Sequence, residues 1–390
     1  MHSAYHGLVQ DLHTLAHRLT GIKVKFVLRK NLGLWLLMAS VASTVLSAWA
    51  PLAMANNKAS AATPRKPKTP TGPPFGERAD AMALADTLAQ RHALPTTWVR
   101  KQLSQAREIS SIPKLVLPPP VGVPKNWAAY HDRFVEPRRI EAGRAFWETH
   151  RAALARAEAQ FGVPAAMLVG IIGVETYYGR HMGNYRVIDA LTTLGLNFPA
   201  EHPRAAERQK FFQDELGHLL VQMRKSPKMT FAGSYAGAMG WPQFMPSSWA
   251  RFAVDFDGDG RIDLINSPVD AIGSVARYFQ AFGWKTGMPT HYAVNLDSPD
   301  LQKEVLLAPD ILPSFSALRF QELGAQLGPE AQAHVGPLAL VELQNGEQPA
   351  SYVAGTENFY VVTRYNWSSY YAMAVIKLGE AVARDMQNRR

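Results

Sequence analysis

The chain has 390 residues, of which 47% are hydrophobic and 19% charged, the composition of a folded protein with room for two or three subdomains. Its formal charge of +9 comes from the N-terminal part, because residues 75–390 carry 32 basic and 31 acidic side chains and so present no overall basic field for a nucleic acid. The absence of cysteine excludes disulfides, thiolate metal sites, a cysteine nucleophile and a lipidated N-terminal cysteine.

The first 74 residues have the pattern of an export signal followed by a linker. Leu32 to Leu52 is uncharged and largely apolar, follows four basic residues, and ends at the small-x-small pattern Ala53-Met54-Ala55. We expect a secretory signal over 1–55 that is cleaved after Ala55, with an uncleaved membrane anchor as the alternative. Residues 56–74 are rich in proline, glycine and basic residues, which predicts a disordered basic linker on a soluble periplasmic protein.

From residue 75 onward the spacing of apolar residues favours helices. Helices are expected over 78–90, 96–106, 140–161, 164–176, 203–223, 269–282 and 369–386. Between 292 and 362 the pattern changes to short apolar runs cut by turn residues, which predicts a small β subdomain with strands at 304–308, 338–342 and 359–363. The expected fold class is therefore α+β and predominantly helical.

The helix expected over 164–176 ends in a single carboxylate. Every residue from Ala165 to Val174 is apolar or glycine, and Gly179 follows as a stop signal. Burial and the negative end of the helix dipole both disfavour a charged Glu175, which predicts a raised pKa and a protonated general acid near neutral pH. The alternative is a glutamate that reaches solvent at the end of the helix.

Residues 255–266 have the pattern of a calcium-binding loop. Three carboxylates at alternate positions can converge on one hard cation, and a glycine permits the tight turn: Asp255, Asp257, Asp259 and Gly260. Asn266 stands where the pattern has a glutamate, so Asp270 in the next helix is expected to complete the shell, and Arg261 falls where the pattern uses a backbone carbonyl. We expect one structural calcium ion and no organic cofactor; an acidic surface turn is the alternative.

Two further segments combine aromatic rings with amide and hydroxyl side chains. Gly233–Ser248 is rich in small residues, with Gln243 and several aromatics among them, and Thr363–Trp367 has similar chemistry. Small residues allow the backbone to approach a ligand closely, while flat rings and amides suit sugar rings. A glycine-rich connection between helices is the alternative for the first segment.

Taken together, these segments resemble the lytic murein transglycosylase B family, glycoside hydrolase family 103. The similarity runs from about Trp127 to Val382 and rests on Gly170–Glu175, Ile188–Leu191, Gly233–Ser248, the Asp255 loop with Asp270–Gly273, and Arg364–Asn366. The resemblance implies a lysozyme-like core with a helical flanking domain, a small β subdomain and an EF-hand-like loop. It also implies cleavage of the MurNAc–GlcNAc β-1,4 bond of peptidoglycan with formation of 1,6-anhydro-MurNAc.

The resemblance also implies domain bounds and site residues. We expect the flanking domain over 75–145, the core over 146–290, the β subdomain over 291–355 and a C-terminal groove segment over 356–390. Glu175 matches the catalytic acid, and Trp241-Pro242 departs from the small or aromatic pair expected before the groove glutamine. The implied groove residues are Tyr130, Ser234, Gln243, Tyr365 and Asn366, and the implied calcium residues are Asp255, Asp257, Asp259, Arg261 and Asp270. The implied partners are peptidoglycan glycan strands and other cell-wall enzymes, with no nucleic acid, and the chain is expected to be a monomer.

The chemistry can also be argued from the carboxylates alone. Most glycosidases use two carboxylates about 5 to 10 Å apart, but here only Glu175 is well placed, because Asp189 is expected to cap the following helix. One carboxylate suffices if Glu175 protonates the glycosidic oxygen and then accepts the proton of the substrate's C6 hydroxyl as that group closes on C1. A hydrolytic muramidase and a non-catalytic peptidoglycan-binding protein are the alternative functions.

Overall fold

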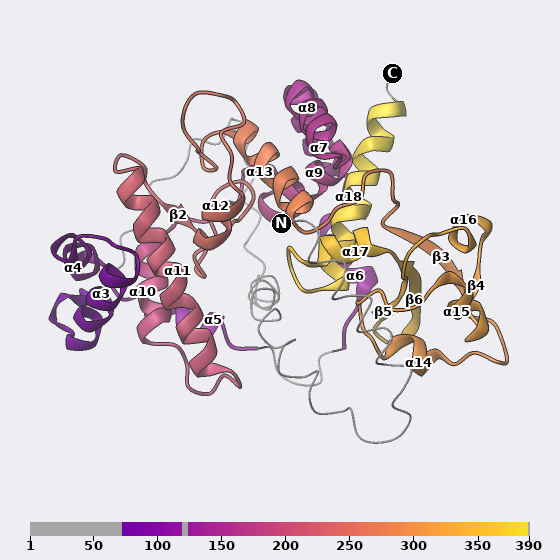
Figure 1. Cartoon of the computed structure of the whole chain (residues 1–390), viewed down its shortest axis with the longest axis horizontal. Helices are drawn as coiled ribbons and strands as arrows, with labels where there is room; N and C mark the ends of the chain where they lie inside the picture. Colours follow the sequence, from indigo (N-terminus) through magenta and orange to yellow (C-terminus); the bar gives the residue numbers. More distant parts are fainter. Residues whose placement is uncertain (1–71, 119–123, 389–390) are drawn as a thin grey trace, which may run out of the picture. The chain divides into compact units, whose positions relative to one another are not determined.

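The computed structural model describes residues 72–118 and 124–388, so the expected signal over 1–55 and nearly all of the expected linker over 56–74 lie outside the described residues. The described part is mostly helical, as expected (Figure 1). Its helices are η3 (Phe75–Glu77), α3 (Ala79–Arg91), α4 (Thr96–Gln105), α5 (Ile112–Leu115), α6 (Trp127–Phe134), α7 (Pro137–Thr149), α8 (Arg151–Phe161), α9 (Ala165–Thr176), α10 (Val187–Leu196), α11 (Ala205–Lys225), α12 (Pro246–Phe252), α13 (Pro268–Ala281), α14 (Lys303–Leu307), α15 (Ala317–Glu322), α16 (Pro329–Gln332), α17 (Glu357–Thr363) and α18 (Ser369–Asn388).

The strands form two small antiparallel sheets. They are β1 (Tyr185–Arg186), β2 (Ala232–Gly233), β3 (His291–Asn295), β4 (Gln326–Leu327), β5 (Ala339–Asn345) and β6 (Gln348–Gly355). β1 pairs with β2, and the other four strands are ordered β4-β3-β6-β5. At one end of β6, Gly355 lies opposite His291 of β3 and opposite Ala339 of β5, so β6 is a central strand of the sheet.

Two of the three expected strands are helical instead. The strand predicted over 304–308 falls mostly in α14, and the one predicted over 359–363 falls in α17. In α17 the Thr356 side chain accepts the Asn358 N–H as an N-cap, and Phe359, Val361 and Val362 are all buried. Because this segment is buried on several sides, its run of apolar residues shows neither a strand period nor a helix period. The Thr356 cap at its start stabilises the helix instead.

The single helix predicted over 140–161 is two helices, α7 and α8, with a break at His150. His150 leaves helical geometry at φ −111° and ψ 23°, and its N–H still bonds to Phe146 O as the last bond of α7. The start also differs, because Pro137 occupies the first turn of α7 and the Glu136 side chain accepts the Arg138 N–H.

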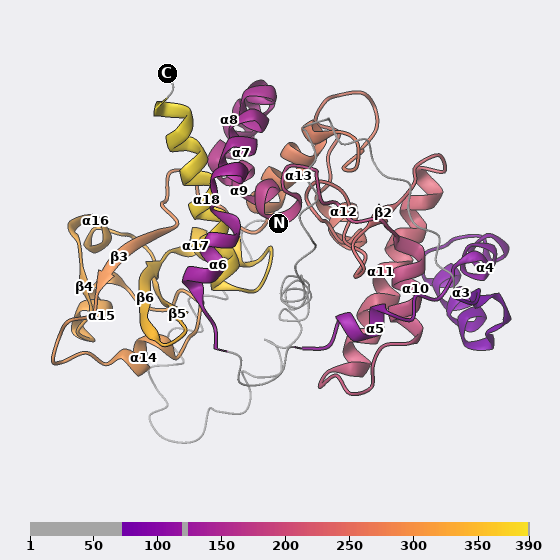
Figure 2. The same ribbon diagram turned by 180° about the vertical axis from the view of Figure 1, so that it is seen from behind.

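The centre of the larger hydrophobic core is the pair α9 and α18, which run side by side in Figures 1 and 2. Glycine allows their backbones to touch. A Cβ added to Gly170 would lie 2.3 Å from Val375 O, and one added to Gly379 would lie 2.2 Å from Ala166 O. Any larger residue at either position would push the two helices apart, so these glycines set how closely α18 packs along α9.

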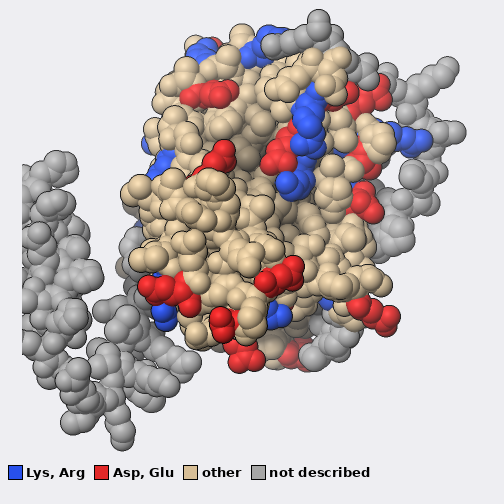
Figure 3. All heavy atoms as spheres, turned by 90° about the vertical axis from the view of Figure 1, so that its right-hand side faces the viewer, with Lys and Arg blue, Asp and Glu red and all other residues tan. Residues whose placement is uncertain are grey.

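A second, smaller hydrophobic cluster lies between the four-stranded sheet and the short helices α14 to α16. On the face that carries this sheet, basic side chains lie among acidic ones and between wide uncharged areas (Figure 3). In the described ranges 72–118 and 124–388 no single helix is long and apolar enough to cross a membrane; α8 and α9 meet that test only as a pair bent by 116°.

Candidate active site

Glu175 lies in the last turn of α9, one residue before the helix ends at Thr176. Ten of the twelve residues of this helix are buried, and Glu175 is one of the two that keep some exposure. The apolar helix therefore carries its one carboxylate from the core to a position that keeps some exposure.

The backbone beyond Glu175 turns in an unusual way. Tyr177, Tyr178 and Gly179 have φ of 52°, 55° and 81°, so the left-handed stretch begins two residues before the predicted glycine stop. The buried Thr176 hydroxyl supports the turn, since it accepts the Gly179 N–H at 3.0 Å and donates to Trp241 O at 3.0 Å. Left-handed tyrosines are costly and are found where the surrounding structure holds a functional geometry in place.

Arg139 of α7 contacts the C-terminal end of α9 as well. Its Nη1 donates to Gly173 O at 2.8 Å, and its guanidinium lies 4.5 Å from the centre of the Tyr177 ring. One of the last α9 carbonyls is thus paired with a charged donor, as is favourable at a helix C-terminus.

The environment of Glu175 is that of a proton donor. Burial raises its pKa to about 7, and a hydrogen bond from Tyr371 partly opposes that rise. The Tyr371 hydroxyl donates to Glu175 Oε1, and Tyr371 is completely buried in the first turn of α18. With Oε1 engaged, Oε2 is the oxygen that can carry the transferable proton.

A group of tyrosines surrounds this pair. Tyr365 stacks on Tyr371 with ring centres 6.3 Å apart, and Tyr278 lies 4.8 Å from Tyr365. Burial, together with the negative charge of Glu175, holds the pKa of Tyr130, Tyr278 and Tyr365 well above the usual value for a phenol. Four neutral phenols therefore lie within electrostatic reach of one carboxyl group, and they offer hydrogen bonds and flat rings without adding charge.

Ser234 and Gln243 lie in the loop between β2 and α12. The Ser234 hydroxyl accepts the Ala238 N–H at 3.0 Å. Gln243 has φ +48°, and its Nε2 donates to Met182 O at 3.2 Å and to Gly240 O at 2.9 Å. Both amide hydrogens are thus committed to the backbone, so the amide is held in one orientation with its oxygen as the acceptor.

The segment after α17 contributes Tyr365 and Asn366. The Tyr365 hydroxyl donates to Pro242 O, which ties this segment to the loop that carries Gln243. Asn366 is 2% exposed, and its side-chain oxygen has no hydrogen-bond partner among the described residues. A buried oxygen of this kind is costly unless a ligand or water donates to it.

Asp189 does not cap α10 as predicted. It lies in the first turn of that helix, completely buried, and its Oδ1 accepts the Arg107 N–H at 2.9 Å. Its other oxygen lies 3.4 Å from Arg186 Nη1. Asp189 therefore ties the chain after α4 to α10. In the described structure Asp189 is not among the groups that shift the pKa of Glu175.

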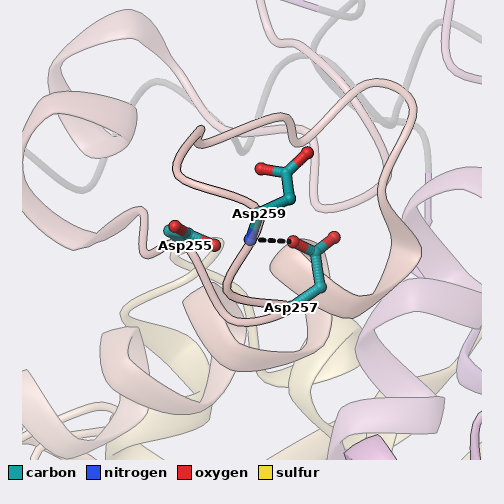
Figure 4. A group of neighbouring side chains, drawn as sticks. All are labelled: Asp255, Asp257 and Asp259. Carbon is teal, nitrogen blue, oxygen red and sulfur yellow. Dashed lines mark hydrogen bonds between the residues drawn. The ribbon is translucent and has the colours of Figure 1, made fainter.

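The aspartates predicted to bind a cation converge in a loop between α12 and α13 (Figure 4). Asp255, Asp257 and Asp259 are exposed, and one oxygen from each lies within 4.8 Å of the others. The loop is shaped by its own amides: Asp255 accepts the N–H groups of Gly258 at 2.7 Å and Gly260 at 2.8 Å. Three hard oxygen donors this close together suit Ca²⁺ better than softer metals.

Asp270 lies outside that cluster, and the expectation for Arg261 concerns its backbone carbonyl rather than its side chain. Asp270 is 1% exposed and accepts the N–H groups of Phe256, Asp257 and Asp263 at 2.7, 3.2 and 2.8 Å. The Arg261 side chain forms an exposed ion pair with Asp259 at 2.9 Å. In this structure Asp270 of α13 stabilises the loop by accepting three of its backbone N–H groups. Among the described residues the acidic cluster consists of the three alternating aspartates.

The sequence patterns did not point to Tyr371, whose hydroxyl donates a side-chain hydrogen bond to Glu175 Oε1. Tyr371 is 196 residues away from Glu175 in the chain, at the start of a helix predicted only from its apolar spacing. Tyrosines follow soon after Tyr365 in the sequence and could have indicated a further site residue, but no local pattern links Tyr371 to a particular carboxylate.

Comparison with known proteins gives consistent matches. A family model described as "Transglycosylase SLT domain" matches residues 76–380. The membrane-bound lytic murein transglycosylase B of Escherichia coli K12 is 39% identical over 324 residues, 80% of this chain and 85% of that protein.

Solved structures agree with these matches. The E. coli lytic transglycosylase Slt35 has been solved with bulgecin A (38% identity, TM-score 0.70) and with calcium (37%, 0.69), in each case covering 80% of this chain and 96% of that one. SltB3 of Pseudomonas aeruginosa in complex with NAG-anhNAM-pentapeptide is 27% identical with a TM-score of 0.64, covering 78% of this chain and 79% of that one.

Proposed function

The chain belongs to the transglycosylase SLT domain family and is a lytic transglycosylase that acts on peptidoglycan; we propose that Glu175 is its single catalytic acid. The observation that carries the assignment of Glu175 is its place at the end of the buried apolar helix α9, where Tyr371 engages one oxygen and burial raises its pKa to about 7. A carboxyl group with this pKa can donate a proton near neutral pH and take one back in the same cycle.

The reaction needs only one protein carboxylate. Glu175 gives its proton to the glycosidic oxygen, the bond from that oxygen to C1 of MurNAc breaks, and the GlcNAc side leaves as an alcohol. The C6 hydroxyl of the same MurNAc then bonds to C1 and passes its proton to Glu175, which restores the acid. The product is 1,6-anhydro-MurNAc and no water is consumed. The SltB3 relative, solved with NAG-anhNAM-pentapeptide, supports a product of this chemical class for this chain.

The glycan is proposed to lie along Tyr130, Ser234, Gln243, Tyr365 and Asn366. The unpartnered oxygen of Asn366 and the oriented amide of Gln243 offer fixed hydrogen-bonding groups, and the tyrosines offer flat faces. The loop at 240–243, which carries Gln243, contacts both Thr176 at the end of α9 and Tyr365. Glycan strands are thus the proposed partner.

A hydrolytic muramidase is the runner-up. It would usually need a second carboxylate or another group to activate water. Within the described residues, burial and the Tyr371 hydroxyl shift the pKa of Glu175, no second carboxylate does so, and Asp189 is engaged elsewhere. This arrangement favours the single-carboxylate route over hydrolysis.

Product analysis tests the proposal. Purified peptidoglycan is digested with the wild type and with Glu175→Gln, and the fragments are examined by mass spectrometry before and after borohydride reduction. Anhydro products are one water lighter than hydrolytic ones and do not react with borohydride. Reducible ends from the wild type would point to a muramidase, and the absence of any released fragment would point to a binding protein.

We further propose that the loop at 255–270 binds one calcium ion. The converging oxygens of Asp255, Asp257 and Asp259 fit a hard cation, and the related Slt35 was solved in complex with calcium. The ion would offset the repulsion among the three carboxylates and so stabilise the loop between α12 and α13. No step of the reaction is assigned to it.

The enzyme is also proposed to be exported to the periplasm as a soluble monomer. Peptidoglycan lies outside the cytoplasm, and the apolar run ending at Ala53-Met54-Ala55 has the pattern of a cleaved signal. The near-neutral charge of residues 75–390 and the mixed charges in Figure 3 fit a glycan substrate better than a nucleic acid.

A further inference from the structure

Besides Asp189 and Asp270, another buried acid lies outside the reaction described above. Glu215, on α11, is 3% exposed. Its two carboxylate oxygens both face Ser247: Oε2 accepts the Ser247 N–H at 2.8 Å, and Oε1 accepts the Ser247 hydroxyl at 2.6 Å. Burying a carboxylate costs solvation free energy, which the two hydrogen bonds from Ser247 offset. A buried acid of this kind is a candidate for a functional role.

The partner of Glu215 is the start of α12. Pro246 has no N–H, and Met245, the N-cap residue, makes no side-chain cap, so the Ser247 N–H is the first free donor of this helix. Glu215 satisfies it from another helix. Ser247 is itself 8% exposed, so without Glu215 both of its donors would be left largely out of reach of water.

The helix start is close to the active-site loop. Only three residues separate Ser247 from Gln243, and on the other side Gln243 is held by Gly240, whose carbonyl accepts both its backbone and side-chain N–H groups. Gln243 therefore lies between two fixed points, one at Gly240 and one at the pair Glu215–Ser247. Its left-handed backbone, at φ +48°, requires such support.

The same loop also reaches the groups around Glu175. Trp241 O accepts the Thr176 hydroxyl, directly after the catalytic acid, and Pro242 O accepts the hydroxyl of Tyr365. A shift at the start of α12 would therefore displace the groove amide and disturb the contacts that hold the end of α9.

Two charged neighbours act on Glu215. Burial raises its pKa to about 7, Arg251 of α12 favours the carboxylate, and the adjacent Asp214 opposes it. Ionised Glu215 can accept both Ser247 donors. Glutamine can accept one and donate to the serine oxygen, so it can keep the same geometry without a charge, whereas leucine can do neither.

We propose that Glu215 is a positioning residue: by binding Ser247 it fixes the start of α12 and so holds the Gln243 loop in the geometry that receives the glycan. This inference rests on the proposed function, because it takes the Gln243 loop to be part of the glycan groove.

The test compares Glu215→Leu, Glu215→Gln and Ser247→Ala with the wild type, and uses Glu201→Leu, an exposed acid before the same helix, as control. Each variant is measured for kcat and KM per folded molecule on soluble glycan strands. We expect Glu215→Leu to lower kcat/KM about tenfold or more, mainly through KM, because a misplaced binding group costs this much. Glu215→Gln should recover most of the loss, and Ser247→Ala should fall in between.

Binding gives a readout that is independent of turnover. In the inactive Glu175→Gln background, adding Glu215→Leu should weaken the Kd for glycan strands by a similar factor. If the variants that carry Glu215→Leu do not fold, the KM and Kd of Ser247→Ala test the inference instead. This variant keeps the backbone N–H bond to Glu215 and loses only the hydroxyl.

Variants with a lower melting temperature but unchanged KM and Kd would overturn the inference and leave Glu215 with a purely structural role. A wild type that makes no anhydro product would instead overturn the proposed function, and the binding series would still report on Glu215.

Discussion

The hydroxyl of Tyr371 donates a hydrogen bond to Oε1 of Glu175, across 196 residues of sequence. The two residues lie at the end of α9 and the start of α18, helices whose close approach depends on Gly170 and Gly379. The bond favours the charged carboxylate, while burial favours the neutral acid and is the larger effect. The pKa of about 7 thus reflects helix packing as much as the local sequence.

Replacing Tyr371 by phenylalanine should raise the pKa of Glu175 further. The hydrogen bond that favours the carboxylate is lost, and such a bond contributes about 1.5 kcal/mol, or about one pH unit. The alkaline limb of the kcat–pH profile should therefore move to higher pH by about that amount. Tyr370→Phe is the matched control, because that hydroxyl donates to Gln344 O. A limb that stays in place in folded Tyr371→Phe would contradict the role assigned to this bond.

Glu175→Gln should fold and lose activity by at least about 100-fold, the lower range for removal of a general acid. The amide retains the shape of the side chain and can still accept the Tyr371 hydrogen bond, but it cannot give a proton to the leaving oxygen. Release of anhydro fragments, measured by chromatography and mass spectrometry, reports the loss. Turnover at the wild-type rate would remove Glu175 from the mechanism.

The same substitution should change how stability depends on pH. Because the pKa of Glu175 rises from 4.5 to about 7 on folding, its contribution to stability is fully present below pH 4.5 and is lost as the pH rises through 7. Glutamine has no such loss. Relative to the wild type, Glu175→Gln should therefore gain about 1 to 3 kcal/mol between pH 4.5 and 8. Urea unfolding at both pH values measures this, and a difference that shrinks with rising pH would count against the raised pKa.

Sequence patterns succeeded where the chemistry is local. The apolar run and the glycines of α9 predict a buried helix with Glu175 in its last turn, and the alternating aspartates predict that Asp255, Asp257 and Asp259 converge. Each inference depends on residues within about fifteen positions of one another, so a period or a spacing is enough to read it.

The same approach failed where distant segments decide the structure. Residues 359–363 look like a strand, but Thr356 caps them as a helix and Asn358 bonds to Lys285 and Met288 from another part of the chain. Likewise, the sequence pattern favours Asp189 as a helix cap, yet its carboxylate accepts the backbone N–H of Arg107, far away in the chain. Contacts of this kind leave no period in the sequence, so they could not be predicted from it.

Calcium should raise the melting temperature of the enzyme, and Asp257→Ala should abolish that rise. A ligand that binds only the folded state stabilises it by mass action, and Asp257 offers one of the three converging oxygens. Asp297→Ala, which removes an exposed carboxylate elsewhere, is the control and should keep the response. If chelation stopped catalysis at a temperature where the fold stays intact, a purely structural role for the ion would be wrong.

The mature protein should begin near Asn56 and should be found in the soluble periplasmic fraction. Leu32 to Leu52 follows four basic residues and ends at Ala53-Met54-Ala55, the arrangement that a signal peptidase cuts, and without cysteine no acyl chain can be attached at a new N-terminal cysteine. N-terminal sequencing of the protein purified from its natural host checks this, and a variant with Ala53 and Ala55 replaced by bulky residues serves as the uncut control. A full-length chain that leaves the membrane only with detergent would instead identify Leu32 to Leu52 as a retained anchor, because a run of that length is sufficient to span the bilayer.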